Sequence, residues 1–172
     1  MPRLTYLLIP LVAACGLDEF DVDQPIPEQT IQGSGIPAPL AALFPLPLDL
    51  DLQAKIKAQK NAGSVDKITL SSLRLTITAT RRPPGDTDDW SFVESVEVFV
   101  ASRAPNTTLP KVKIASVANP GAVEVMEFAV EPGVNLRRYV EEGAQVDTRG
   151  SGTIPADDVS YDGLAVFSVD VL

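Results

Sequence analysis

Apolar and polar side chains alternate with a period of two along most of the chain beyond residue 46. This is the period of a β-strand, in which successive side chains point to opposite faces. The segment 46–52 shows it most simply, because leucine occupies every second position. A chain patterned in this way is expected to form sheets with one buried face, and the pattern argues against a mainly helical protein.

The strand expected at 67–80 changes its parity near the middle. Its apolar residues are Ile68 and Leu70 before the change, then Leu73, Leu75, Ile77 and Ala79 after it. Both sets can point into one core only if an extra residue is inserted at Ser71 and Ser72. The sequence therefore predicts a β-bulge at these two serines.

Trp90 to Ser102 carries apolar residues at both parities, which predicts a central strand buried on both faces. Further strands are expected at 112–114 and 123–130, on either side of a turn, and at 145–154 and 164–172, which we expect to pair and close the fold.

One helix is expected at 135–143, where Asn135 can cap the start and Gly143 can end it. The stretch 53–58 is ambiguous and could form a helical turn.

About seven or eight short strands and one short connecting helix predict an antiparallel β-sandwich of immunoglobulin-like or fibronectin-like appearance. The Cys-Trp-Cys signature of a true immunoglobulin domain is absent, because the chain has a single cysteine. A curled sheet that encloses a lipid-sized cavity is the alternative architecture.

The N-terminus has the pattern of a secretory signal. Arg3 supplies a positive charge, and a mostly apolar run follows from Leu4 to Ala14. At about 1.5 Å per residue this run reaches only about half of the roughly 30 Å hydrocarbon core, and Pro10 interrupts it. We therefore expect the run to be removed as a signal peptide, not kept as a transmembrane helix.

The run ends in Leu11-Val12-Ala13-Ala14-Cys15, which resembles the lipobox of bacterial lipoproteins. The resemblance covers the first fifteen residues and implies cleavage before Cys15 and lipidation of its sulfur, with acyl chains such as palmitate. Gly16 stands where Asp is the commonest sign of inner-membrane retention in the family, which favours the outer membrane. The alternative is an ordinary secretory signal followed by an incidental cysteine.

The predicted organisation is a signal peptide at 1–14, a lipidated cysteine with a proline-rich tether at 15–47, and a β-sandwich domain at 48–172. Proline at this density favours extended chain that would hold the domain away from the bilayer. The segments 20–22 and 29–31 are unusually apolar for a free linker, so they are alternatively edge strands packed on the domain. The sequence leaves both alternatives open.

Composition excludes several kinds of chemistry. The chain contains no histidine, and its only cysteine is assigned to lipid, which removes Ser-His-Asp, Cys-His and Cys/His zinc sites. We predict no catalytic residue and no cofactor. The formal net charge of −9 disfavours nucleic acid as a partner. The expected partners are the membrane, through the lipid, and an envelope protein.

Candidate sites are few. Asp86, Asp88 and Asp89 are weak candidates for a Ca²⁺ site, although acidic residues beside glycine and proline are also typical of a solvated turn. The hydroxyls Ser71-Ser72 lack a base to activate them and are better explained by the bulge. The other candidates considered, each also explained as ordinary surface or turn, are the acidic pair Asp157-Asp158, the cationic pairs Arg81-Arg82 and Arg137-Arg138, and Asn106 in a glycosylation-like triplet.

Three functions remain open at this level. The first is a non-enzymatic structural or interaction module on the bacterial cell envelope, anchored in the outer membrane. The second is a carrier of lipid or another apolar ligand, which needs an enclosed cavity. The third is a carboxylate-dependent hydrolase, which needs two acids that converge in a cleft.

Overall fold

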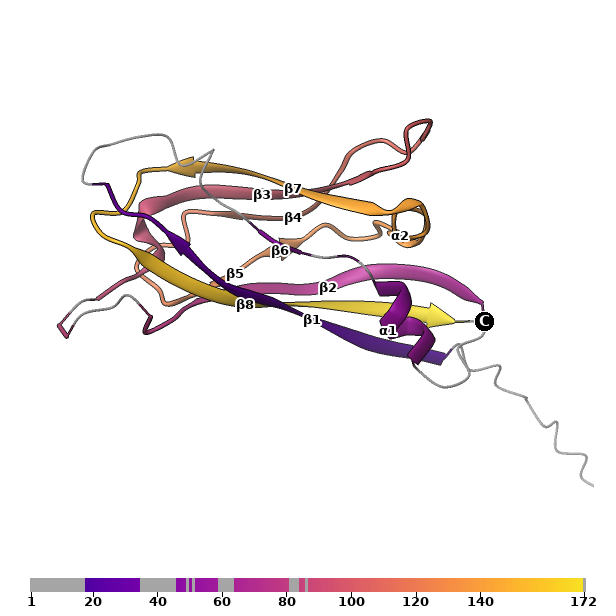
Figure 1. The fold of residues 1–172 in the computed structure, drawn as a ribbon, viewed down its shortest axis with the longest axis horizontal. Helices are drawn as coiled ribbons and strands as arrows, with labels where there is room; N and C mark the ends of the chain where they lie inside the picture. Colours follow the sequence, from indigo (N-terminus) through magenta and orange to yellow (C-terminus); the bar gives the residue numbers. More distant parts are fainter. Residues whose placement is uncertain are drawn as a thin grey trace, which may run out of the picture.

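The protein is an antiparallel β-sandwich, as the alternation predicts (Figure 1). The computed structural model describes residues 18–34, 46–48, 50, 52–58, 64–80, 84–85 and 87–171. The strands are β1 (Asp18–Ile31), β2 (Val65–Ile77), β3 (Val93–Ser102), β4 (Val112–Ala118), β5 (Val125–Glu127), β6 (Ala129–Val130), β7 (Ala144–Gly152) and β8 (Val159–Val171). Two helices accompany them, α1 (Leu52–Ala58) and α2 (Arg137–Glu142).

The first sheet has the order β1-β8-β2-β5 and contains the N-terminal segment that the sequence left undecided. Strand β1 pairs with β8 along its whole length, from Asp18 opposite Val171 to Ile31 opposite Val159. The packed alternative therefore holds for residues 18–31, and the sandwich begins before residue 48. Prolines are tolerated in β1 because it is an edge strand.

The predicted bulge in β2 is confirmed. The pairing of β2 with β8 shifts register between Leu70 and Ser72. Residues buried before and after the shift therefore face the same core, while Ser71 and Ser72 are exposed. The buried residues are Ile68, Leu70, Leu73, Leu75 and Ile77.

The second sheet has the order β6-β4-β3-β7, so β3 is central, as expected. The expectation that β3 is buried on both faces is wrong. Val96, Val98 and Val100 are buried, whereas Glu97 and Phe99 on the other face are only half-buried. No layer covers this face in the described part of the chain, so it meets solvent. The residues before it, 90–92, form a short 3₁₀ turn in place of the expected strand.

The strand expected at 123–130 is divided between the two sheets. β5 pairs with β2 in the first sheet, and β6 pairs with β4 in the second. The crossing point is Phe128, whose side chain is buried and whose amide donates to the carbonyl of Leu73 at 3.0 Å. The closing pair is also wrong, because β7 and β8 lie in different sheets.

The leucine-rich segment before α1 is buried but does not form the strand that was expected. Leu46, Leu48, Leu50 and Leu52 all belong to the core. The amide of Leu48 donates to the carbonyl of Leu46 at 2.8 Å, and Leu52 donates to Leu50 at 2.7 Å. Bonds over two residues are those of γ-turns, which satisfy the backbone locally without a neighbouring strand. The ambiguous stretch that follows is helix α1.

The helix predicted at 135–143 is confirmed as α2. The side chain of Asn135 accepts from the amide of Arg137 at 3.0 Å, so it satisfies a free amide of the first turn. Gly143 ends the helix at φ 84°, a conformation that glycine adopts without strain. One face of the helix packs on the core through Leu136, Tyr139 and Val140.

The antiparallel topology gives the sandwich two distinct ends (Figure 1). The proximal end contains the starts of β1 and β2, the ends of β3 and β8, and helix α2. The distal end contains the opposite strand ends and the loops at 87–92, 119–124 and 153–158. Near the distal end Trp90 is fully buried, stacks edge-on with Tyr161 at 5.4 Å, and donates its indole N–H to the carbonyl of Glu124.

Candidate functional site

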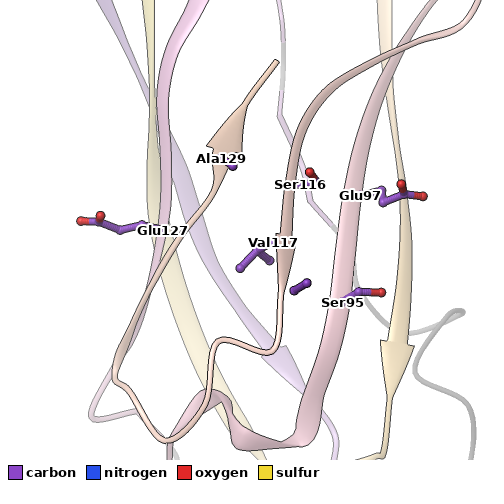
Figure 2. A pocket seen from close by; sticks show the side chains of 7 residues that line it. Ser95, Glu97, Ser116, Val117, Glu127 and Ala129 are labelled. Carbon is purple, nitrogen blue, oxygen red and sulfur yellow. The ribbon is translucent and has the colours of Figure 1, made fainter. Parts of the chain in front are cut away.

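A hollow of about 510 Å³ lies where the two sheets separate (Figure 2). We call it the β4–β5 notch; its lining residues are Ser95 and Glu97 of β3, Ser116, Val117 and Ala118 of β4, Glu127 of β5, and Ala129 of β6. It forms because β6 pairs with β4 at only two positions, Ala115 and Ser116. The chain reaches the first sheet through Phe128, so β4 and β5 diverge beyond that point.

The notch is open to solvent and contains small, hydroxyl and apolar side chains between two glutamates. Figure 2 shows the side chains of Glu97 and Glu127 pointing away from each other. Glu97 instead faces Lys113 across the sheet, with the ammonium at 3.6 Å. The two carboxylates therefore do not converge, and the hollow is open to solvent on one side.

Strand β5 and the residues just before it extend this surface with exposed apolar groups. Val123 and Val125 are 41% and 42% exposed, and they are the exposed large hydrophobic residues in the described part of the chain. Val125 lies on the same face of β5 as Glu127, since Met126 between them is buried. β5 is an edge strand that pairs only with β2 among the described strands. Edge strands with exposed apolar side chains are places where further chains add.

A second hollow, of about 470 Å³, lies beside α2 near the proximal end. One oxygen of Glu142 accepts from the hydroxyls of Thr107 and Ser102 at 2.6 and 2.7 Å. These hydrogen bonds, that of Thr107 first, hold the pKa of Glu142 below its ordinary value because they favour the charged form. The arrangement ties the β3–β4 loop to α2. The sequence analysis missed it, since Ser102 and Glu142 are far apart in the chain.

The outer face of the second sheet carries a charged cluster that the sequence analysis also missed. The ammonium of Lys111 and the guanidinium of Arg149 lie 5.3 and 5.0 Å from the ring centre of Phe99. Lys113 is paired with Glu131 at 3.0 Å, which raises the pKa of that lysine. Cross-strand pairs of this kind stabilise an exposed sheet face.

The candidate calcium ligands are only partly described. Asp88 is buried, and Asp89 accepts from the amide of Ser91 at 2.9 Å, so it caps the 3₁₀ turn. Asp86 lies outside the described residues. Within the described ranges, no three His, Cys, Asp or Glu residues are placed to hold a metal ion. The three aspartates therefore stay weak candidates, and a solvated turn stays the preferred interpretation.

Asp157 and Asp158 form a structural contact with the segment after β1. The amide of Gly33 donates to a carboxylate oxygen of Asp158 at 3.1 Å. The backbones approach so closely that a Cβ atom at Gly33 would lie 2.2 Å from the carbonyl carbon of Asp157. This contact holds the N-terminal segment against the β7–β8 loop and gives the carboxylate of Asp158 a structural role.

The remaining candidates lie apart from the notch. Arg137 is paired with Glu141 at 2.8 Å, and Arg138 is 3.7 Å from Glu142. Asn106 is exposed in the β3–β4 loop. Cys15 and the pair Arg81-Arg82 lie outside the described residues, and the exposed serines at 71 and 72 are explained by the bulge.

No protein-family model matches the chain, and the comparison with curated proteins finds no significant match. In the part of the chain that the structure describes, no helix is long and apolar enough to cross a bilayer.

Proposed function

We propose that the protein is a lipid-anchored component of the bacterial cell envelope whose sandwich is a non-enzymatic interaction module. Lipid on Cys15 holds it in a membrane, with the outer membrane favoured by Gly16. The observation that carries the interaction role is the β4–β5 notch together with the exposed Val125 on the adjoining edge strand β5 and Val123 just before it. Exposed apolar surface beside unpaired strand edges favours contact with a protein partner.

The geometry gives less support to the two rival functions. A carrier of apolar ligands needs an enclosed cavity, and the hollows described above are open. A hydrolase needs two convergent carboxylates, and the two in the notch point apart. These observations favour the interaction module.

The lipid anchor is tested by expressing the wild type and Cys15→Ser in a bacterial host, followed by membrane fractionation and intact mass. We expect the wild type in the membrane fraction, with acyl mass on a chain that begins at Cys15. We expect the Cys15→Ser variant to be unprocessed or free of lipid. A soluble wild type with a free thiol would contradict the proposal.

The interaction role is tested by site-specific photo-crosslinking in the same host. A photoreactive residue at Val125 is expected to yield a discrete crosslinked species, whereas one at Asn106, exposed in the β3–β4 loop far from the notch, is not. Equal crosslinking at both positions, or none at Val125, would argue against the notch as the contact surface.

A further inference from the structure

We propose that the sandwich is oriented with its proximal end against the membrane, where it contacts an anionic lipid surface. The distal end points away from the membrane. This inference rests on the lipid anchor of the proposed function and adds the orientation of the domain. Two independent features carry it: the length of chain between the anchor and β1, and the uneven distribution of charge along the sandwich.

The anchor is close to the folded domain. Only Gly16 and Leu17 lie between Cys15 and Asp18, where β1 begins. At about 3.5 Å per residue the chain from Cys15 to Asp18 spans at most about 10 Å. The proline-rich segment cannot act as the spacer, because it follows β1 in the chain. The start of β1, and with it the proximal end, is therefore held near the headgroups.

The charge distribution favours the same orientation. The distal end is strongly acidic: its described acidic residues are Glu28, Asp88, Asp89, Glu94, Glu124, Asp157, Asp158 and Asp162. Lysine and arginine are absent from the described residues of this end, taken as 27–34, 76–80, 84–85, 87–95, 117–125 and 150–163, while Arg81 and Arg82 fall outside the described part of the chain. An anionic surface repels the described acids of this end.

The proximal end carries both signs. Its described basic residues are Lys55, Lys67, Arg103, Lys111, Arg137 and Arg138, and its described acidic residues are Glu19, Asp21, Asp23, Asp66, Glu141, Glu142, Asp147 and Asp170. The side chain of Arg138 is 63% exposed, and its pairing with Glu142 at 3.7 Å is long. Exposed pairs are weak, so the guanidinium remains available to lipid phosphates.

The two ends are far enough apart for their difference in charge to orient the sandwich on a charged membrane. The fourteen residues of β1 span roughly 45 Å at about 3.3 Å per residue. The Debye length at physiological salt is only about 8 Å. The repulsion between the distal acids and the membrane is therefore screened when the long axis of the sandwich is perpendicular to the membrane. A tilted or inverted domain would bring them to the anionic surface. In this orientation Val123 and Val125 lie at the end of the sandwich that is away from the membrane.

The orientation is tested with the full lipidated chain in vesicles of phosphatidylethanolamine and phosphatidylglycerol that contain a headgroup quencher lipid. Because Cys15 is blocked by lipid, a fluorophore can be attached to one new thiol, Ser64→Cys at the proximal end or Ala156→Cys at the distal end. Both positions are exposed. We expect severalfold stronger quenching at the proximal label. Equal quenching at both labels, or stronger quenching at the distal one, would overturn the inference.

The contribution of charge is tested by a matched pair of triple variants that retain the wild-type melting temperature. Lys67→Gln/Arg137→Gln/Arg138→Gln removes three cations from the proximal end, whereas Arg74→Gln/Lys113→Gln/Arg149→Gln removes three from the middle of the sandwich. We expect only the first to lower proximal quenching on anionic vesicles. An equal effect of both would overturn the role assigned to the proximal cations.

Flotation of the same vesicles separates this inference from the proposed function. If the chain does not float with them, the lipid anchor itself is wrong. If it floats but both labels respond alike, the anchor stands and the orientation is wrong.

Discussion

At the residue scale, the closest backbone approaches occur at glycines, and Gly163 shows what they require. It lies in β8 opposite Leu75 of β2, in the middle of the first sheet. A Cβ atom there would be 2.5 Å from a methyl carbon of Leu75 and 2.6 Å from the carbonyl oxygen of Arg74. The methyl group can turn aside, but the backbone oxygen moves only with its strand.

We expect Gly163→Ala to destabilise the fold by about 1–3 kcal/mol, because the added methyl group forces β2 and β8 apart. Urea denaturation measures the change. The control is Asp162→Ala, an exposed neighbour in the same strand, which is expected to change stability by less than about 0.5 kcal/mol. A Gly163→Ala variant as stable as the wild type would show that the strands can separate without cost.

The hydrogen bonds of Glu142 predict a dependence of stability on pH. The folded state lowers the pKa of Glu142, so its carboxylate contributes stability above the ordinary glutamate pKa of about 4.3. That contribution is lost as pH falls through the lowered value. We expect Glu142→Gln to be less stable than the wild type at neutral pH, and the difference to shrink below about pH 4.

Urea denaturation at neutral and acidic pH measures this difference. The hydroxyl donors supply the control: Ser102→Ala/Thr107→Val should remove most of the pH-dependent part of the effect of Glu142→Gln. A difference of the same size at both pH values would show that the carboxylate charge is not responsible.

At the scale of elements, one inserted residue decides which way β2 faces. The shift between Leu70 and Ser72 lets the buried residues on both sides point into one core. Without it, either Ile68 and Leu70 or the later apolar residues would turn to solvent. The serines themselves are exposed, so their side chains contribute little to the core.

We expect deletion of Ser71 to destabilise the fold by more than about 3 kcal/mol, because at least two buried side chains, Ile68 and Leu70, would turn to solvent and burial of each contributes about 1.5–3 kcal/mol. Ser71→Ala keeps the inserted residue and is expected to fold normally. Circular dichroism and urea denaturation of the two variants measure the effect. A stable, cooperatively folded deletion variant would contradict the role of the bulge.

At the scale of the whole molecule, β1 is the part of the fold that lies nearest in sequence to the proposed anchor at Cys15. The strand supplies Val22, Ile26 and Ile31 to the core and pairs with β8 over its full length. A lipid on Cys15 would therefore be attached almost directly to the sandwich, not through a long tether.

We expect deletion of residues 18–31 to prevent stable folding, because it removes three core side chains and exposes the edge of β8. Insertion of a flexible glycine-serine linker between Leu17 and Asp18 should leave the stability unchanged, since β1 is preserved. Size-exclusion chromatography and thermal melting distinguish the two. A folded, monomeric deletion variant would show that β1 is dispensable.

The sequence alone determined the features that depend on neighbouring residues. The period of two predicted the all-β sandwich, the parity change predicted the bulge at Ser71, and Asn135 with Gly143 marked helix α2. These features depend on which side of a strand or helix is apolar, and the order of neighbouring residues determines that side. The exclusion of imidazole chemistry likewise needed only the composition.

Only the tertiary structure decided which segments became partners. Alternation in the leucine segment 46–52 correctly predicted that the leucines are buried. It did not predict that γ-turns would take the place of strand pairing. The apolar residues of β1 indicated that this segment could pack on the domain, but they did not indicate that it pairs with β8. The crossing at Phe128, which opens the β4–β5 notch, and the hydroxyls around Glu142 join residues distant in the chain. Hydrophobic patterning specifies a buried face, whereas partners depend on how all the faces pack together.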